Sequence, residues 1–241
     1  MVCKMVLESE VVRSSMKLGS PPGNMTRKAQ TKLFPFFLKL GARRCLVVGA
    51  GSIAETKIAG LLEAGAKVRV VAPEATPKVR GWARGRKIAW QRRGFRSKDL
   101  EGMFLVVAAT PSTKLHEQIF RHARRGGVLC NIVDVPRLCD FYYPAVVRRG
   151  ALQIAISTTG QSPALAQRLR KELERQFGPE YEHWLTHIGK VRQKMQVRNL
   201  DAEERKRWLH ELASEKSFEK FHEPSRRPHA ARRKDSPRTF R

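Results

Sequence analysis

The segment from residue 43 to 65, RRCLVVGAGSIAETKIAGLLEAG, constrains the fold more than any other part of the chain. Its start, CLVV at residues 45 to 48, is an apolar run that ends at a glycine, which is typical of a strand buried on both faces in a parallel sheet. Residues 49 to 54, GAGSIA, then fit the GxGxxG/A pattern. Apolar residues at helical spacing follow the turn, and these are Ile53, Ile58, Leu61 and Leu62. The segment therefore predicts a strand, a glycine turn and a helix in succession.

This order of elements favours a dinucleotide site over an ordinary glycine-rich loop, which is the alternative. Gly49 would make the tight turn, Gly51 would let the backbone approach a pyrophosphate, and Ala54 would allow close packing of helix on strand. Free backbone N–H groups and the helix dipole both favour an anion at the start of the helix. Ala50, Ser52 and Ile53 complete the candidate phosphate turn.

Composition narrows the class of protein. The chain has 241 residues with 41% hydrophobic content, which suits one large domain or two small ones. No apolar stretch is long enough for a membrane span, and Glu8, Glu10 and Arg13 interrupt the N-terminal segment, so we expect neither a membrane protein nor a secretory signal. The four cysteines lack CxxC spacing and are interpreted as reduced thiols of a cytoplasmic protein.

The formal net charge of +26 makes nucleic acid, a membrane surface or a polyanionic substrate candidate partners. The basic residues are spread along the chain, and no RNP aromatic pattern, zinc-finger spacing or helix-turn-helix accompanies them. Specific nucleic-acid binding is therefore not expected. Solvated surface without a partner is the other interpretation of this charge.

Strands and helices alternate after the glycine turn. We expect strands over residues 67 to 72, 104 to 109 and 128 to 133, and a helix from Thr113 to Arg125. Between Trp82 and Trp90 we expect a short helix and a strand, the latter at residues 87 to 90. This alternation predicts an α/β protein with a Rossmann-like, doubly wound parallel sheet, whose ligands lie outside the carboxyl ends of the strands. The Gly49 turn, Thr110 and Asp134 would then share one edge.

Five segments are expected along the chain. They are a disordered extension (1–31), an NAD-binding Rossmann domain (32–140), a small α+β dimerisation and substrate region (141–163), a helical region (164–222) and a basic disordered tail (223–241). Within the Rossmann domain, residues 33 to 40 are expected to pack beside the first strand, with Pro35 preventing a regular helix. The small region contains two antiparallel strands joined at Arg149-Gly150.

Several blocks resemble one family in the same order. They are the stretch from Leu33 to Glu74, VVAAT, CNIVDVPRLCDFYYPA and ISTTGQSPALAQRLRKELE, which together cover about residues 33 to 195. They are similar to the precorrin-2 dehydrogenase / sirohydrochlorin ferrochelatase family, which also forms the N-terminal module of sirohaem synthase. The resemblance implies NAD-dependent dehydrogenation of precorrin-2 to sirohydrochlorin in sirohaem biosynthesis, often followed by ferrochelation with ferrous iron as substrate. A regulatory Rossmann domain that senses NAD without turnover is the alternative, and it should lack the block from NIVD to FYYPA.

The resemblance also implies roles for individual residues. Gly49, Gly51, Ser52 and Ile53 match the phosphate turn, Pro73 and Glu74 the adenosine side, and Thr110 and Asn131 the nicotinamide side, while Ser157, Thr158, Thr159, Gly160 and Ser162 would line the substrate side. The acidic residue usual at the end of the second strand is displaced to Glu74, and the nearby Lys78 and Arg80 leave NADP as an alternative to NAD. Ser162 is equally suited to cap the helix that begins with Pro163.

Asp134 matches the aspartate on which the family depends. Loss of a hydride and a proton from the macrocycle needs a nearby base, and metal insertion needs deprotonation of pyrrole N–H groups. The alternative role for Asp134 is that of a turn residue, since Asp is common at strand ends. No metal site is expected, because His183 and His187 lack a third ligand. The anionic tetrapyrrole suits a basic protein, and the resemblance implies a homodimer.

Overall fold

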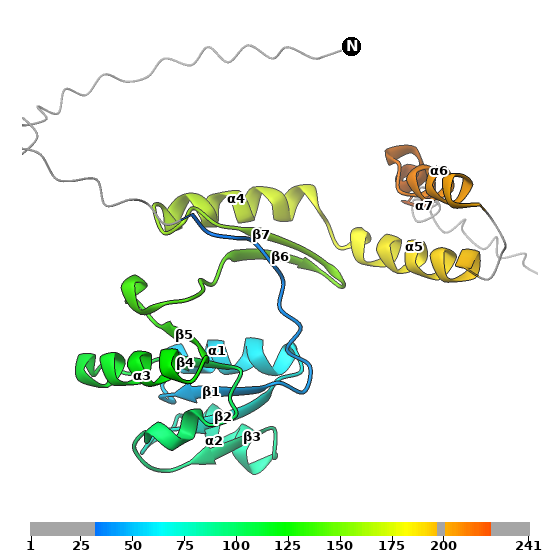
Figure 1. Ribbon diagram of the computed structural model, residues 1–241. Helices are drawn as coiled ribbons and strands as arrows, with labels where there is room; N and C mark the ends of the chain where they lie inside the picture. The colour runs from blue at the N-terminus through cyan, green and yellow to red at the C-terminus, as the bar shows by residue number, and fades with distance from the viewer. Residues whose placement is uncertain (1–31, 197–200, 223–241) are drawn as a thin grey trace, which may run out of the picture. The chain divides into compact units, whose positions relative to one another are not determined.

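The computed structural model describes residues 32–196 and 201–222. The expected extension (1–31) and tail (223–241) lie outside the described residues. The first part of the fold contains β1 (Arg44–Val48), α1 (Ser52–Glu63), β2 (Lys67–Val71), α2 (Pro77–Arg84), β3 (Ile88–Gln91), the 3-10 helix η1 (Ser97–Leu100), β4 (Leu105–Ala108), α3 (Thr113–Arg125) and β5 (Leu129–Ile132). Strands and helices alternate as predicted (Figure 1).

The five strands form one parallel sheet in the order β3-β2-β1-β4-β5. Val48, the last residue of β1, pairs with Val71 on one side and with Ala108 on the other. The carboxyl ends of the strands therefore meet at one edge, and the order reverses at β1. This is the Rossmann-like arrangement that the sequence predicts, and its switch point lies beside the glycine turn.

Alternate residues of the strands face opposite layers of helices, as the pleat of a strand requires. Cys45 and Val47 pack in a core cluster with Ala54 and Ile58 of α1. Leu46 and Val48 belong to a second cluster, which contains Ile119 and Ala123 of α3. Helices therefore cover both faces of the sheet, so its central strands β1 and β4 are buried on both sides.

The remaining elements are η2 (Pro136–Leu138), β6 (Ala145–Arg149), β7 (Leu152–Ile156), α4 (Pro163–Gln176), α5 (Glu180–Gln196), α6 (Ala202–Leu212) and α7 (Glu215–His222). β6 and β7 form the predicted antiparallel pair, and α4 packs along it (Figure 1). Tyr181 and Trp184 of α5 contact Phe218 of α7, with ring centroids 4.6 and 4.9 Å apart. No helix within the described ranges is both long and apolar enough to span a bilayer.

Three expectations about packing and boundaries are wrong in part. Of residues 33 to 40, only Leu40 is buried, whereas Phe37 is 67% exposed, because the segment forms neither helix nor strand and only its last residue joins the core cluster. Ile53 is 52% exposed, since it lies in the first turn of α1 beyond the sheet edge, and Ala54 takes the buried position. The second helix begins at Pro77 rather than near Trp82, because the side chain of Thr76 caps it.

Candidate functional site

The glycine turn is held between two strands. The Gly49 N–H donates to the Val71 carbonyl (3.0 Å), and the Ala109 N–H donates to the Val48 carbonyl (2.8 Å). The Ala50 carbonyl, in turn, accepts from the Thr76 N–H (3.1 Å). These bonds fix the turn at the switch point of the sheet.

The N-terminus of α1 differs from those of α2, α3, α4 and α6. Thr76, Ser112, Ser162 and Asp201 each accept a backbone N–H in the first turn of their helices. The residue at this position in α1 is Gly51, which has no side chain to do so. The first N–H groups of α1 are therefore left for another acceptor, and an anion suits them because of the helix dipole.

The two glycines of the turn differ in backbone conformation and in the space around them. Gly49 has φ +105°, and a Cβ there would lie 2.9 Å from the Ala109 carbonyl carbon. Gly51 has φ −81°, and a Cβ there would meet no atom within 4 Å. The chain itself therefore requires glycine at 49, whereas the open space beside Gly51 fits the close approach of a pyrophosphate.

This difference predicts opposite outcomes for two alanine variants. We expect Gly49→Ala to lower the free energy of unfolding by about 3 kcal/mol, because it adds both an overlap with backbone and a strained φ. Gly51→Ala serves as the control and should change it by less than about 0.5 kcal/mol. Urea unfolding of the two variants measures the difference, and equal midpoints would contradict the packing argument.

The loop after β2 contains the two residues that are expected on the adenosine side. Ala72 is buried, and its carbonyl accepts from the Trp90 indole N–H (3.0 Å). Pro73 and Glu74 follow it and are exposed at the carboxyl edge. The Ala50 to Thr76 hydrogen bond ties this loop to the glycine turn. The structure therefore places both predicted residues beside the phosphate turn.

Thr110 lies directly behind the same turn. Its Cγ2 atom would be 3.3 Å from a Cβ at Gly49. The His116 Nε2 atom lies 2.7 Å from the Thr110 carbonyl oxygen and 3.2 Å from its hydroxyl. Thr110 is thus fixed in place between the turn and α3.

The two polar residues of the β5 end differ in exposure. Asn131 is 6% exposed, and its amide donates to the Phe141 carbonyl (2.8 Å), so this group holds the loop that returns from β5. Asp134 is exposed and has φ +61°. Left-handed backbone is tolerated by Asp and Asn. Asp134 therefore has the conformation of a turn residue and also presents a carboxylate at the sheet edge.

Lys57 interacts electrostatically with this carboxylate. The Lys57 ammonium is 3.8 Å from the centroid of the Tyr143 ring, a cation–π contact. Burial lowers the pKa of Lys57, and the negative charge of Asp134 opposes that change. Lys57 therefore places a positive charge near the Asp134 carboxylate.

The predicted substrate residues form a turn closed by their own side chains. The Thr158 hydroxyl donates to the Ser162 carbonyl (3.1 Å), and the Ser157 hydroxyl accepts from the Thr159 N–H (3.1 Å). Thr159 and Gly160 both have positive φ. The Ser162 hydroxyl accepts from the Leu165 N–H (3.2 Å), so its predicted role as a helix cap is confirmed. These hydrogen bonds stay within residues 157 to 165.

Comparisons with known proteins agree with this arrangement. A family model for NAD(P)-binding domains matches residues 36–145, and the model of the sirohaem biosynthesis protein central region matches residues 149–176. Siroheme synthase of Nitrosococcus oceani is 42% identical over 140 residues, which is 58% of this chain and 30% of that protein. Siroheme synthase of Mannheimia succiniciproducens is 36% identical over 180 residues, which is 74% of this chain and 38% of that protein. The chain belongs to the family of the N-terminal sirohaem synthase module.

A solved structure extends the similarity to a protein of comparable size. SirC, precorrin-2 dehydrogenase, matches with a TM-score of 0.67 and 25% identity, over 80% of this chain and 100% of that chain. By contrast, the chain spans only about a third of the length of the two siroheme synthases above. The predicted family and the predicted Rossmann-like fold are therefore confirmed.

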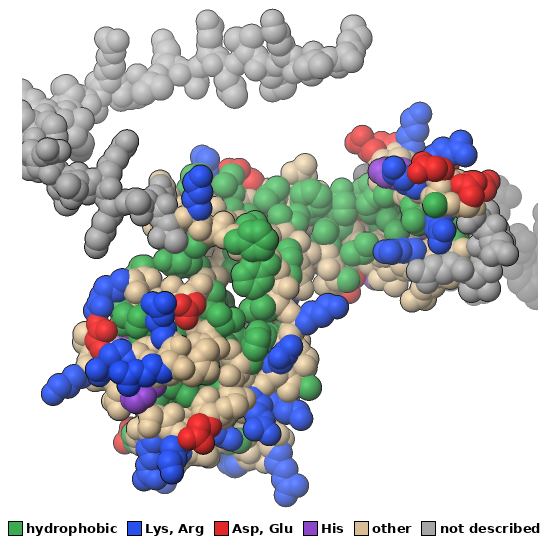
Figure 2. Space-filling view, in the orientation of Figure 1, with side chains coloured by type: hydrophobic (Ala, Val, Ile, Leu, Met, Phe, Trp, Pro, Cys, Tyr) green, Lys and Arg blue, Asp and Glu red, His purple; other side chains and the backbone are tan. Residues whose placement is uncertain are grey.

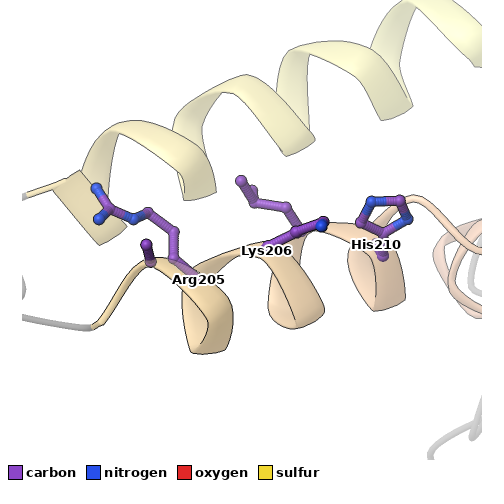
Figure 3. Close-up of a pocket in the computed structure, with 5 residues that line it drawn as sticks. Arg205, Lys206 and His210 are labelled. Atoms are coloured by element: carbon purple, nitrogen blue, oxygen red, sulfur yellow. The ribbon is translucent and has the colours of Figure 1, made fainter.

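One hollow of the chain is lined by none of the expected site residues. It has a volume of about 300 Å³ and is lined entirely by α6, where Arg205, Lys206 and His210 project along one side (Figure 3). None of its lining residues is a carboxylate that could act as the expected base. The residues with suitable chemistry gather instead at the carboxyl edge of the sheet.

Proposed function

We propose that the chain is an NAD-dependent dehydrogenase that converts precorrin-2 to sirohydrochlorin in sirohaem biosynthesis. The observation that carries the proposal is the shared edge of the sheet: the uncapped start of α1 and the exposed carboxylate of Asp134 both lie there. The match to SirC, precorrin-2 dehydrogenase, over its whole length supports the choice of substrate.

In this proposal the turn residues hold the cofactor. The N–H groups at the start of α1 bind the pyrophosphate, with Gly49, Ala50, Gly51, Ser52 and Ile53 around it. Pro73 and Glu74 contact the adenosine, and Thr110 and Asn131 lie on the nicotinamide side. NAD, when bound, supplies the acceptor for a hydride.

Asp134 acts as the base. Removal of two hydrogens from precorrin-2 releases one as a hydride and one as a proton, and the Asp134 carboxylate takes the proton. Lys57 places a positive charge near this carboxylate. Ser157, Thr158, Thr159, Gly160 and Ser162 are proposed to contact the tetrapyrrole.

Surface charge supports an anionic substrate. Figure 2 shows Lys and Arg side chains distributed over the visible face of the nucleotide-binding part, with few Asp and Glu among them. Precorrin-2 carries several acetate and propionate groups, so a basic surface steers it toward the protein. Ferrous iron is the proposed second substrate where the same carboxylate also assists metal insertion.

Anaerobic incubation of the full chain with precorrin-2 tests the proposal. With NAD, the chromophore should convert to that of sirohydrochlorin, with equimolar NADH formed. Addition of ferrous iron to the product then tests chelation separately. NAD binding without any conversion of precorrin-2 would favour the regulatory alternative, a domain that senses NAD without turnover.

The cysteines support a reducing, cytoplasmic setting for this reaction. Cys45, Cys130 and Cys139 are free thiols. Burial raises the pKa of Cys45 to about 11 and that of Cys130 to about 12, so both stay protonated at neutral pH. Such thiols fit structural roles rather than disulfide or redox chemistry.

A homodimer is the proposed assembly. Leu152, Ile154 and Ile156 of β7 are only half-buried, and Leu165 of α4 is 39% exposed. Hydrophobic side chains gather over α4 and the β6–β7 pair in Figure 2. We expect this surface to be covered by a second copy, and sedimentation at micromolar concentration should give about twice the mass of one chain. Charged substitution of Leu165 should shift the mass toward the monomer, and a wild-type monomer would contradict the proposal.

A further inference from the structure

His116 is a buried histidine that the proposed chemistry does not use. It lies in the first turn of α3 and is 7% exposed. Its Nε2 atom is 2.7 Å from the Thr110 carbonyl oxygen. A carbonyl oxygen can only accept, so Nε2 carries the hydrogen and donates it to Thr110. A buried polar side chain with one short, directed bond is placed to hold its partner.

Thr110, the hydrogen-bond partner of His116, lies with Ala109 directly behind the phosphate turn. Ala109 is bonded to the end of β1 through the Val48 carbonyl (2.8 Å). The Ala109 carbonyl and the Thr110 methyl group are the atoms nearest to where a Cβ of Gly49 would lie. A shift of Thr110 would therefore change the packing against Gly49 and the position of the turn.

The segment between β4 and α3 has few other restraints at this point. Ser112 caps α3 by accepting from the Leu115 N–H, and the Ser112 carbonyl accepts from the His116 N–H (3.0 Å). These bonds order the start of the helix, but neither of them reaches Thr110. The His116 side chain connects α3 to Thr110, behind the Gly49 turn.

We propose that His116 is a positioning residue of the dinucleotide site, which sets the affinity for NAD by holding Thr110 against the Gly49 turn. The identity of the dinucleotide rests on the proposed function. The role requires a hydrogen-bond donor at the position of Nε2, so a glutamine amide can replace the imidazole and an aliphatic side chain cannot.

The test is calorimetric titration of the full chain with NAD, without tetrapyrrole. His116→Leu removes the donor at similar volume, and the Kd for NAD should rise about tenfold, as for loss of one buried hydrogen bond. His116→Gln should stay within about threefold of wild type. In turnover assays, the KM for NAD should rise in the leucine variant while the KM for precorrin-2 stays unchanged.

Ser112→Ala is the matched control. It removes the cap of the same helix without touching Thr110, so it should lower the melting temperature and leave the Kd for NAD unchanged. A leucine variant with lowered melting temperature and wild-type Kd would overturn the proposal, because His116 would then only stabilise α3. If the leucine variant does not fold, His116→Asn decides in its place, since its shorter amide falls short of Thr110 and the Kd must rise.

The outcomes separate this inference from the proposed function. A wild-type chain that binds NAD but leaves precorrin-2 unchanged contradicts the dehydrogenase, and the effect of His116 on NAD binding still stands or falls by itself. A wild-type chain that binds no NAD overturns both.

Discussion

Replacement of Asp134 by Asn is expected to slow precorrin-2 dehydrogenation by about 100-fold or more, the usual scale for loss of a general base. The amide keeps the size of the side chain but cannot take a proton. The backbone should be unaffected, because Asn tolerates the φ of +61° found at this residue. Turnover measured at saturating NAD, together with the Kd for NAD, checks the prediction, and the Kd should stay within about twofold.

Asp134→Gly sharpens the same test. Glycine accepts positive φ even more readily than aspartate, so it satisfies the turn while it removes the carboxylate. If Asp134 serves only the turn, both variants should keep wild-type turnover; if it is the base, both should lose it. Near-normal turnover in either variant with NAD saturating would show that the catalytic assignment is wrong.

The local patterns of the sequence were sufficient to predict the sheet. Each strand is a short apolar run ending at glycine, proline or a polar residue, and each helix carries its own apolar spacing, so neighbouring residues determine the element. Thr113 to Arg125 was predicted with the bounds that the structure gives. Alternation then restricts the topology to a right-handed parallel sheet, which brings the Gly49 turn and Asp134 to one edge.

The contacts between distant segments could not be predicted in this way. Nothing in the sequence near Lys57 indicates that its ammonium lies over the ring of Tyr143, because the return of the chain after β5 brings the two together. The sequence likewise does not indicate that the His116 side chain hydrogen-bonds to Thr110. A histidine eight residues after the end of β4, within an apolar helix face, was the available signal.

The periodicity of the sequence also could not predict which apolar residues are exposed at the ends of helices. Ile53 has the spacing of a core residue, but the first turn of α1 projects past the sheet and leaves it 52% exposed. In the proposed function the same exposure is useful, because Ile53 then borders the dinucleotide. A residue that breaks the expected burial pattern beside a glycine turn is therefore informative about a ligand.

Replacement of Gly51 by Asp is expected to abolish NAD binding and leave the fold intact. The backbone at Gly51 has φ −81°, which any residue adopts, and a Cβ there meets no atom within 4 Å. The added carboxylate would project where the pyrophosphate is proposed to bind, and close like charges cost several kcal/mol. We expect the Kd for NAD to rise by about 100-fold or more, and calorimetric titration measures it.

Gly60→Asp is the control, because it places the same charge on the same helix, at an exposed position with no atom within 4 Å of its Cβ. It should bind NAD as wild type does. Any chelation of preformed sirohydrochlorin should survive Gly51→Asp, since metal insertion uses no nicotinamide, and should weaken in Asp134→Asn, since it needs the base. Equal loss of NAD binding in both glycine variants would trace the effect to α1 as a whole and contradict a pyrophosphate site at Gly51.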